Sequence, residues 1–270
     1  MRNPVARIIL TRTAQASVLA LALHWLTRWP LTGPHALGLF LTPALCLYFV
    51  FVFIAPWSWG LPIQTRLRTR EKAVALTFDD GPSPQTTPFV LAALREHGVK
   101  ATFFVLGEAV DESPGLLRQV VAEGHAIGIH AYRHRAFVGR SLGGIRGEIA
   151  RTREAIYRAC PDAPPPILLR PPHGFKSLRA LWAAHQANCR LVAWNLDARD
   201  YRERDPARIA ANVTARLRPG AIVLLHDGPD SAATVDALAL LLPILQTRGY
   251  RCVPMAPPPP ILGEPEKTGP

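Results

Sequence analysis

The sequence has few cysteines and no paired cysteine motif. Its four cysteines, Cys46, Cys160, Cys189 and Cys252, form no CxxC pair and have no even spacing. This pattern argues against a zinc ribbon and a disulfide framework, although one bridge among the last three cysteines stays open. The sequence also lacks a basic stripe interleaved with aromatic residues, despite a net charge of +11. Nucleic-acid binding is therefore not expected.

The positive charge is concentrated near the N-terminus. Residues 1–72 contain eight of the 31 Lys and Arg residues but a single acidic residue, Glu71. Such a bias beside apolar segments is typical of a membrane-flanking region that faces anionic lipid. The length of 270 residues leaves room for one domain of about 200 residues and an appendage.

The N-terminal appendage is predicted to be a membrane anchor. Residues 36–56 carry no charge and as a helix would reach about 30 Å, the thickness of the hydrocarbon core. Trp57 and Trp59 follow where an interfacial aromatic belt would lie. Residues 13–29 are a candidate second span or an interfacial helix. We therefore expect one or two transmembrane helices within residues 1–65 and a location at the cytoplasmic membrane. The face occupied by the rest of the chain stays open, because it depends on the number of spans.

Residues 66–255 are predicted to form an α/β catalytic domain. Short apolar runs alternate with longer amphipathic stretches, and the strand candidates are 73–78, 101–106, 126–129, 167–170, 191–194, 221–225 and a short run near Cys252. Strands that alternate with helices favour a parallel sheet, either closed as a barrel or open and doubly wound. The Pro-rich tail, residues 256–270, is predicted to be disordered.

Ionisable side chains follow most of the predicted strands. They are Asp79 and Asp80 after the first strand, His130 after the third, Arg170 at the fourth, Asp197 after the fifth and His226 after the sixth. Active sites of parallel barrels and open sheets form at the carboxyl ends of the strands. We therefore expect these side chains to share one face.

Two histidines and an aspartate in this set can hold a metal ion. His130 and His134 are four residues apart, so on a helical turn both rings project from one side. An aspartate at a strand end completes a three-ligand set that leaves a position open for water. Of the adjacent Asp79 and Asp80, one carboxylate could bind the metal while the other accepts a proton from the attacking water. The alternative is that both are solvated turn residues.

These motifs resemble the polysaccharide deacetylase family, also called carbohydrate esterase family four. The segments that carry the resemblance are Thr77-Phe78-Asp79-Asp80-Gly81-Pro82, Gly124-His125 with His130 to His134, Arg170-Pro171-Pro172-His173-Gly174, Asp197-Ala198-Arg199-Asp200-Tyr201 and Leu224-Leu225-His226. They occur in the family's order over residues 72–254.

The resemblance implies a distorted (β/α)7-type barrel with a divalent metal, commonly zinc. It implies that Asp80, His130 and His134 are the metal ligands, Asp79 the general base and His226 the general acid. Arg170 would orient Asp79, and Asp197 would pair with His226 and raise its pKa. The substrate-binding residues would be His173, Tyr201 and Leu224.

Three positions depart from the family pattern. Ala131 stands where the family usually has Ser or Thr, Tyr201 replaces the usual Trp, and His173 replaces a Tyr. None of the three is a predicted metal ligand, so the departures bear on the substrate more than on the chemistry.

Three functions remain open from the sequence. The first is metal-dependent hydrolysis of the N-acetyl amide of an amino sugar in a glycan, which releases acetate. The second keeps this chemistry but acts on a lipid-linked amino sugar, by deacetylation or deformylation, at the membrane lipid surface. The third is a catalytically silent membrane protein that binds glycan.

Overall fold

The computed structural model describes residues 34–49 and 63–255, apart from residue 176. The chain divides into two compact units, Met1–Ala55 and Pro56–Pro270. In the first unit the described element is helix α2, Pro34–Phe49. The predicted tail 256–270 lies outside the described residues and stays a prediction.

The predicted membrane anchor is not supported. Within the described residues, no helix has both the length and the apolar character needed to cross a membrane. This finding contradicts the predicted anchor and the location at the cytoplasmic membrane that rested on it. The candidate second span, residues 13–29, and residues 50–56 of the first lie outside the described residues.

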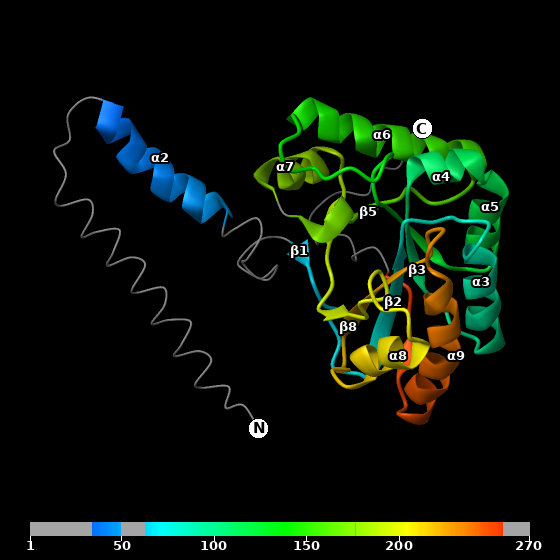
Figure 1. Cartoon of the computed structure of the whole chain (residues 1–270). Coiled ribbons are helices and arrows are strands. Elements are labelled where there is room, and N and C mark those ends of the chain that lie inside the picture. The colour runs from blue at the N-terminus through cyan, green and yellow to red at the C-terminus, as the bar shows by residue number, and fades with distance from the viewer. Residues whose placement is uncertain (1–33, 50–62, 176, 256–270) are drawn as a thin grey trace, which may run out of the picture. The chain divides into compact units, whose positions relative to one another are not determined.

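The second unit is built from short strands that alternate with helices (Figure 1). The strands are β1 Ile63–Gln64, β2 Ala73–Asp79, β3 Thr102–Val105, β4 Ala126–Ile129, β5 Leu168–Leu169, β6 Arg190–Val192, β7 Leu196–Asp197, β8 Ala221–His226 and β9 Arg251–Cys252. The helices are α3 Thr87–Glu96, α4 Gly107–Glu112, α5 Pro114–Ala122, α6 Leu142–Ala159, η2 Pro172–Gly174, α7 Leu178–Gln186, α8 Pro206–Thr214 and α9 Ala232–Thr247. All seven predicted strands are present. The two unpredicted strands, β1 and β7, have two residues each and are too short to show a period in the sequence.

The strands form one curled parallel sheet with the order β1-β6-β5-β4-β3-β2-β8-β7, and β9 also pairs with β2. The segment 190–197 joins the two ends of this order, since β6 pairs with β1 and β7 pairs with β8. The segment after β1 also connects the two ends of the sheet, because Arg66 forms a bridge with Ala221 of β8. This half-barrel fits the predicted (β/α) barrel class.

Side-chain alternation gives the sheet an outer and an inner face. Val74, Leu76 and Phe78 of β2 belong to a large apolar cluster shared with the helices. Ala75, between them, belongs to a smaller inner cluster that also contains Phe104, Leu168, Val192, Ile222 and Met255. Successive side chains of a strand point to opposite faces, so Thr77 and Asp79 continue the inner face of β2. Along β2, the side chains on the inner face therefore change from apolar to polar toward the carboxyl end of the strand.

Side chains cap the N-termini of two helices. Ser141 and Asp205 cap α6 and α8, because their side-chain oxygens accept the N–H groups of Gly144 and Ala207. Ser113 and Ser231 occupy N-cap positions without a side-chain cap bond, and α3 begins at Thr87.

Candidate active site

The inner face ends in four ionisable side chains at the carboxyl ends of the strands. Asp79 and His226 end β2 and β8 and are paired in register. His130 and Arg170 directly follow β4 and β5. The same alternation that forms the inner apolar cluster brings these four side chains to one rim.

Asp79 and Arg170 form a buried ion pair. The guanidinium Nη1 of Arg170 lies 2.7 Å from Oδ1 of Asp79 and donates to Oγ1 of Thr77 at 2.9 Å. Arg170 is fully buried, and its guanidinium stacks 4.1 Å from the ring of Phe104. Burial lowers the pKa of Arg170, and the charge of Asp79 opposes this shift. The pair therefore holds one carboxylate oxygen of Asp79 in a fixed direction.

Asp80, His130 and His134 are the three residues that could hold a metal ion. Their ligand atoms all lie within 4.8 Å of one another. Oδ1 of Asp80 lies 3.5 Å from Nε2 of His130 and 3.3 Å from Nε2 of His134. It is buried and, among the described residues, has no hydrogen-bond partner.

The hydrogen bonds of His130 fix the orientation of its ring. Its Nδ1 lies 2.8 Å from the carbonyl oxygen of Arg170, which can only accept, so Nδ1 carries the proton. This leaves the lone pair of Nε2 directed toward Asp80. Burial lowers the pKa of His134, with Asp80 opposing and the other histidines adding to the shift. Two imidazoles and a carboxylate oxygen without another partner fit a divalent cation such as zinc.

The partner of His226 is Asp200, so the predicted pairing with Asp197 is wrong. Oδ1 of Asp200 lies 2.8 Å from Nδ1 of His226, while Oδ2 accepts the His226 backbone N–H at 2.7 Å and the hydroxyl of Thr234 at 2.8 Å. Asp197 instead accepts the backbone N–H of Arg199 at 2.7 Å. A short aspartate side chain commonly bonds the backbone two residues on, and this turn directs Asp197 away from His226.

Among the histidines of the site, His226 has the most strongly shifted pKa. Burial acts to lower its pKa, but the hydrogen bond and charge of Asp200, with the charges of Asp79 and Asp80, raise it to about 9. A cationic imidazole at neutral pH can donate a proton.

The three predicted substrate-binding residues lie around this rim in different ways. The ring of His173 lies 4.3 Å from that of His134, and its backbone has a φ of 59°. The ring of Tyr201 lies edge-on to His226 at 5.7 Å and is 54% exposed. Leu224 is buried on β8, two residues before His226. Their roles toward a substrate stay predictions.

Sequence reasoning missed Asp200 and Asp227, which are both buried at the site. Oδ2 of Asp227 accepts the hydroxyl of Thr87 at 2.6 Å. Burial raises the pKa of Asp227 to about 7. A Cβ at Gly81 would lie 2.2 Å from this carboxylate, so a larger residue there would have to displace the Asp227 side chain. The signals were present in both cases: Asp200 lies within the fourth motif, and Asp227 directly follows His226.

Comparison with known proteins connects this geometry to a family. The family described as polysaccharide deacetylase matches residues 66–192. A chitooligosaccharide deacetylase from Bradyrhizobium sp. (strain ANU 289) is 40% identical over 196 residues, which cover 68% of this chain and 89% of that relative. The chain belongs to the polysaccharide deacetylase family.

Other polysaccharide deacetylases are similar over the same region. A peptidoglycan-N-acetylglucosamine deacetylase from Bacillus cereus is 37% identical over 199 residues, covering 73% of this chain and 89% of that protein. A solved peptidoglycan N-acetylglucosamine deacetylase, in complex with an N-hydroxybenzamide compound, superposes with a TM-score of 0.70 at 34% identity, covering 74% and 95% of the two chains.

One structural relative is described as inactive. A family four pseudoenzyme from Bacillus anthracis superposes with a TM-score of 0.65 at 27% identity, covering 70% of this chain and 66% of that one. Within the polysaccharide deacetylase family, the fold alone therefore does not decide activity, and the side chains of the site must carry the functional argument.

Proposed function

We propose that this protein is a carbohydrate N-deacetylase that hydrolyses the N-acetyl amide of an amino sugar in a glycan and releases acetate. Two relatives support this reaction, since one acts on chitooligosaccharide and the other on peptidoglycan N-acetylglucosamine. The observation that carries the proposal is the register of Asp79 with His226 on neighbouring strands beside the Asp80, His130 and His134 set.

Asp80, His130 and His134 would hold a divalent cation, with zinc the best match to two imidazoles and one carboxylate. When bound, the cation would supply Lewis-acid chemistry, which lowers the pKa of water and polarises a carbonyl group.

Asp79 acts as the general base. Arg170 binds Oδ1 of Asp79, while Oδ2 lies 3.8 Å from Nε2 of His130 and faces the ligand set. This oxygen accepts a proton from the water whose oxygen attacks the acetamido carbon. Because Arg170 holds the other oxygen, Asp79 needs little reorganisation during the step.

His226 acts as the general acid. Its raised pKa keeps the imidazole protonated at neutral pH, and Asp200 fixes the direction of the ring. His226 donates its proton to the sugar nitrogen as the carbon–nitrogen bond breaks, which yields acetate and an amine. Leu224, Tyr201 and His173 line the position of the acetyl group.

The lipid-linked alternative rested on a membrane anchor that the described residues do not support, so the glycan is the substrate we propose. The silent alternative is weakened because the candidate base, acid and ligand residues are all present in one site.

Acetate release from N-acetylated chitooligosaccharide and from peptidoglycan, before and after treatment with a chelator, tests this function. We expect activity to vanish on chelation and to return with Zn²⁺. The Asp79→Asn variant should lose about 10²- to 10⁴-fold in kcat while still binding Zn²⁺. Full activity of the metal-free protein, or of Asp79→Asn, would contradict the proposal.

A further inference from the structure

The loop between the two candidate metal histidines is held by hydrogen bonds to its backbone. The carbonyl oxygens of Ala131 and Tyr132 accept the N–H groups of Gly107 and Glu108, each at 3.0 Å, from the first turn of α4. The N–H groups of Tyr132 and Arg133 both donate to Oε2 of one carboxylate on α6, that of Glu148, at 3.0 and 2.9 Å. The loop is therefore fixed from two helices.

Glu148 is buried in the middle of α6, with 9% of its surface exposed. Its second oxygen, Oε1, pairs with Nη1 of Arg140 at 2.8 Å. Burial acts to raise the pKa of Glu148, but the N–H of Arg133 and the side chain of Arg140 lower it below the ordinary value. The buried carboxylate therefore has partners on both oxygens, as a buried charge requires.

The loop needs such support because its backbone is strained. Ala131 has a φ of 95° and is fully buried. A non-glycine residue in such a conformation is strained and persists only where the surroundings over-determine it. The Ala131 side chain has no polar atom of its own, so the hydrogen bonds that hold the loop come from neighbouring elements.

We propose that Glu148 is a positioning residue for the metal site. By accepting two successive backbone N–H groups, its carboxylate fixes the turn that places His134 beside His130 and Asp80. This inference rests on the proposed function, since it assigns Glu148 a part in the affinity for the cation.

Zinc titration of the chelator-stripped full chain tests this role, with Zn²⁺ alone as the probe. Glu148→Gln keeps the size of the side chain but removes the charge and one of its acceptor atoms. We expect it to bind Zn²⁺ about 10- to 100-fold more weakly, as is usual when support behind a metal ligand is lost. The matched control is Glu154→Gln on the same helix, where an exposed carboxylate pairs with Arg158; we expect its affinity to stay within about twofold.

A second variant and a second readout guard against loss of folding. Arg140→Gln keeps the Glu148 carboxylate but frees Oε1, and we expect a smaller, severalfold loss of Zn²⁺ affinity. Amide hydrogen exchange of the metal-free protein should show faster exchange at Tyr132 and Arg133 in Glu148→Gln than in the wild type. Wild-type Zn²⁺ affinity in Glu148→Gln would overturn the inference alone. A wild-type chain that binds no Zn²⁺ would overturn the proposed function as well.

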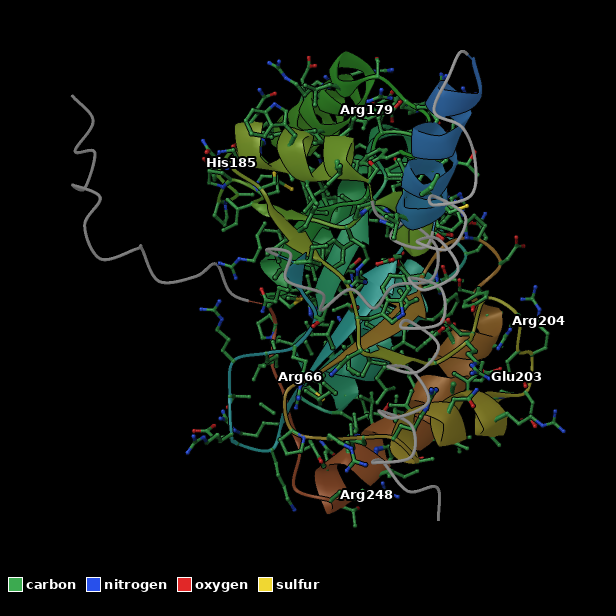
Figure 2. All side chains as sticks on the ribbon, turned by 90° about the vertical axis from the view of Figure 1, so that its left-hand side faces the viewer. Arg66, Arg179, His185, Glu203, Arg204 and Arg248 are labelled. Carbon is green, nitrogen blue, oxygen red and sulfur yellow. The ribbon has the colours of Figure 1, made fainter. Side chains whose placement is uncertain are left out.

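A separate feature is a basic cavity on the loop that carries Asp200. This cavity of about 260 Å³ is lined by Arg199, Arg202, Glu203, Arg208, Ala211 and Asn212. Figure 2 shows Glu203 and its neighbour Arg204 at the surface of this loop. Three arginines and one glutamate therefore line this cavity, and Nε of Arg208 also lies 3.6 Å from Oδ2 of Asp205.

The charges of this basic cavity are not balanced. Oε1 of Glu203 accepts the backbone N–H groups of Arg204 and Asp205, and its Oε2 lies 3.9 Å from Arg208. Within the described part of the chain, no carboxylate is within ion-pair distance of Arg199 or Arg202. An excess of guanidinium groups suits a planar anion such as a carboxylate.

The basic cavity lies next to the candidate general acid. Arg199 and Arg202 flank Asp200 and Tyr201 in sequence. The Tyr201 ring lies 5.7 Å from the ring of His226 and 5.8 Å from the guanidinium of Arg202. Tyr201 therefore lies close both to the candidate general acid and to an arginine that lines the cavity.

We infer that the basic cavity binds a carboxylate of the glycan, on a sugar unit next to the one that is deacetylated. This inference also rests on the proposed function, and it predicts a preference for acidic over neutral glycans. The test compares kcat/KM on a chitooligosaccharide with kcat/KM on an oligosaccharide of equal length that alternates N-acetylglucosamine with N-acetylmuramic acid.

For the variant with both Arg199→Gln and Arg202→Gln, we expect a fall of about tenfold or more on the acidic substrate and a change within about twofold on the neutral one. Arg204→Gln is the matched control, since this arginine donates to the carbonyl oxygen of Asp230 and does not line the cavity. Equal effects on both substrates, or none on either, would overturn this inference while the proposed function stands. Wild-type protein inactive on both substrates would overturn the function itself.

Discussion

In the candidate site, the surroundings of two histidines shift their pKa values in opposite directions. His226 is bound to a buried carboxylate, that of Asp200, and its pKa is raised to about 9. His134 has a lowered pKa, chiefly because it is buried, and its Nε2 faces Oδ1 of Asp80 at 3.3 Å.

This difference shows how one residue type can serve two kinds of chemistry in a single site. A cationic imidazole can donate a proton but has no lone pair for a metal ion, whereas a neutral imidazole can bind one. The nearest carboxylate decides which role each histidine can take. Asp200 bonds Nδ1 of His226, whereas Asp80 faces Nε2 of His134 and belongs to the same candidate metal-ligand set.

The largest effects are expected when each of the two histidines is replaced in turn. His134→Gln should lose both Zn²⁺ affinity and activity, because it removes a ligand. His226→Gln should lose about 10²- to 10⁴-fold in kcat and keep wild-type Zn²⁺ affinity, because it removes only the proton donor. Zinc titration together with acetate release measures both. Loss of Zn²⁺ affinity in His226→Gln would show that the two histidines do not have separate roles.

A smaller effect is expected when the partner of His226 is changed. His226 stays protonated only below its folded pKa of about 9, so wild-type activity should fall as the pH rises through that value. Asp200→Asn removes the hydrogen bond and charge that raise this pKa. Its alkaline limb should therefore move toward the ordinary value of 6.5, with about tenfold or more lost at pH 8. The pH profile of kcat provides the measurement.

Asp197→Asn is the matched control for this change. Asp197 lies three residues before Asp200 in the same segment, but its carboxylate bonds the N–H of Arg199 and not His226. We expect the alkaline limb of the kcat profile to stay near pH 9 and kcat to change by less than about threefold. A shift as large as that of Asp200→Asn would restore Asp197 as the partner that the sequence first indicated.

The smallest effect on activity is expected at a third histidine, His125, just before β4. Its Nδ1 accepts the N–H of Ala101, and burial lowers its pKa to about 4. Because the folded pKa is below the unfolded one, the free energy of unfolding should be highest above pH 6.5 and should fall as the pH drops toward 4. The loss from this group should be about 1–3 kcal/mol.

Chemical denaturation of the wild type and of His125→Asn between pH 7 and pH 4 measures this loss. The variant should show a weaker pH dependence, with acetate release at pH 7 little changed. An identical pH dependence in both proteins would show that His125 does not titrate in this range.

Much of the site could be predicted because strand ends are visible in the sequence. Asp79, His130, Arg170 and His226 each follow or end an apolar run, and the inner face of the sheet brings them to one rim. Asp200 could not be chosen over Asp197 in the same way. Both lie in one motif, and a turn decides which carboxylate points at His226.

The anchor prediction was wrong for a different reason. An uncharged run such as 36–56 measures apolar character, but a membrane span also requires a helix of sufficient length. Among the described residues, no helix meets both requirements. Apolar composition alone therefore does not establish a membrane span.

The sequence by itself determined the order of the strands along the chain, because strand alternation is a local property. Its motifs also carried the family resemblance, which implies the candidate base, acid and metal ligands. The tertiary structure decided two partners that the sequence did not indicate, Asp200 for His226 and Glu148 for the loop before His134, and it places Arg170 against Asp79 as the resemblance implied. These contacts join residues from different strands, loops and helices. Their geometry depends on packing of the whole sheet against its helices, which no local pattern records.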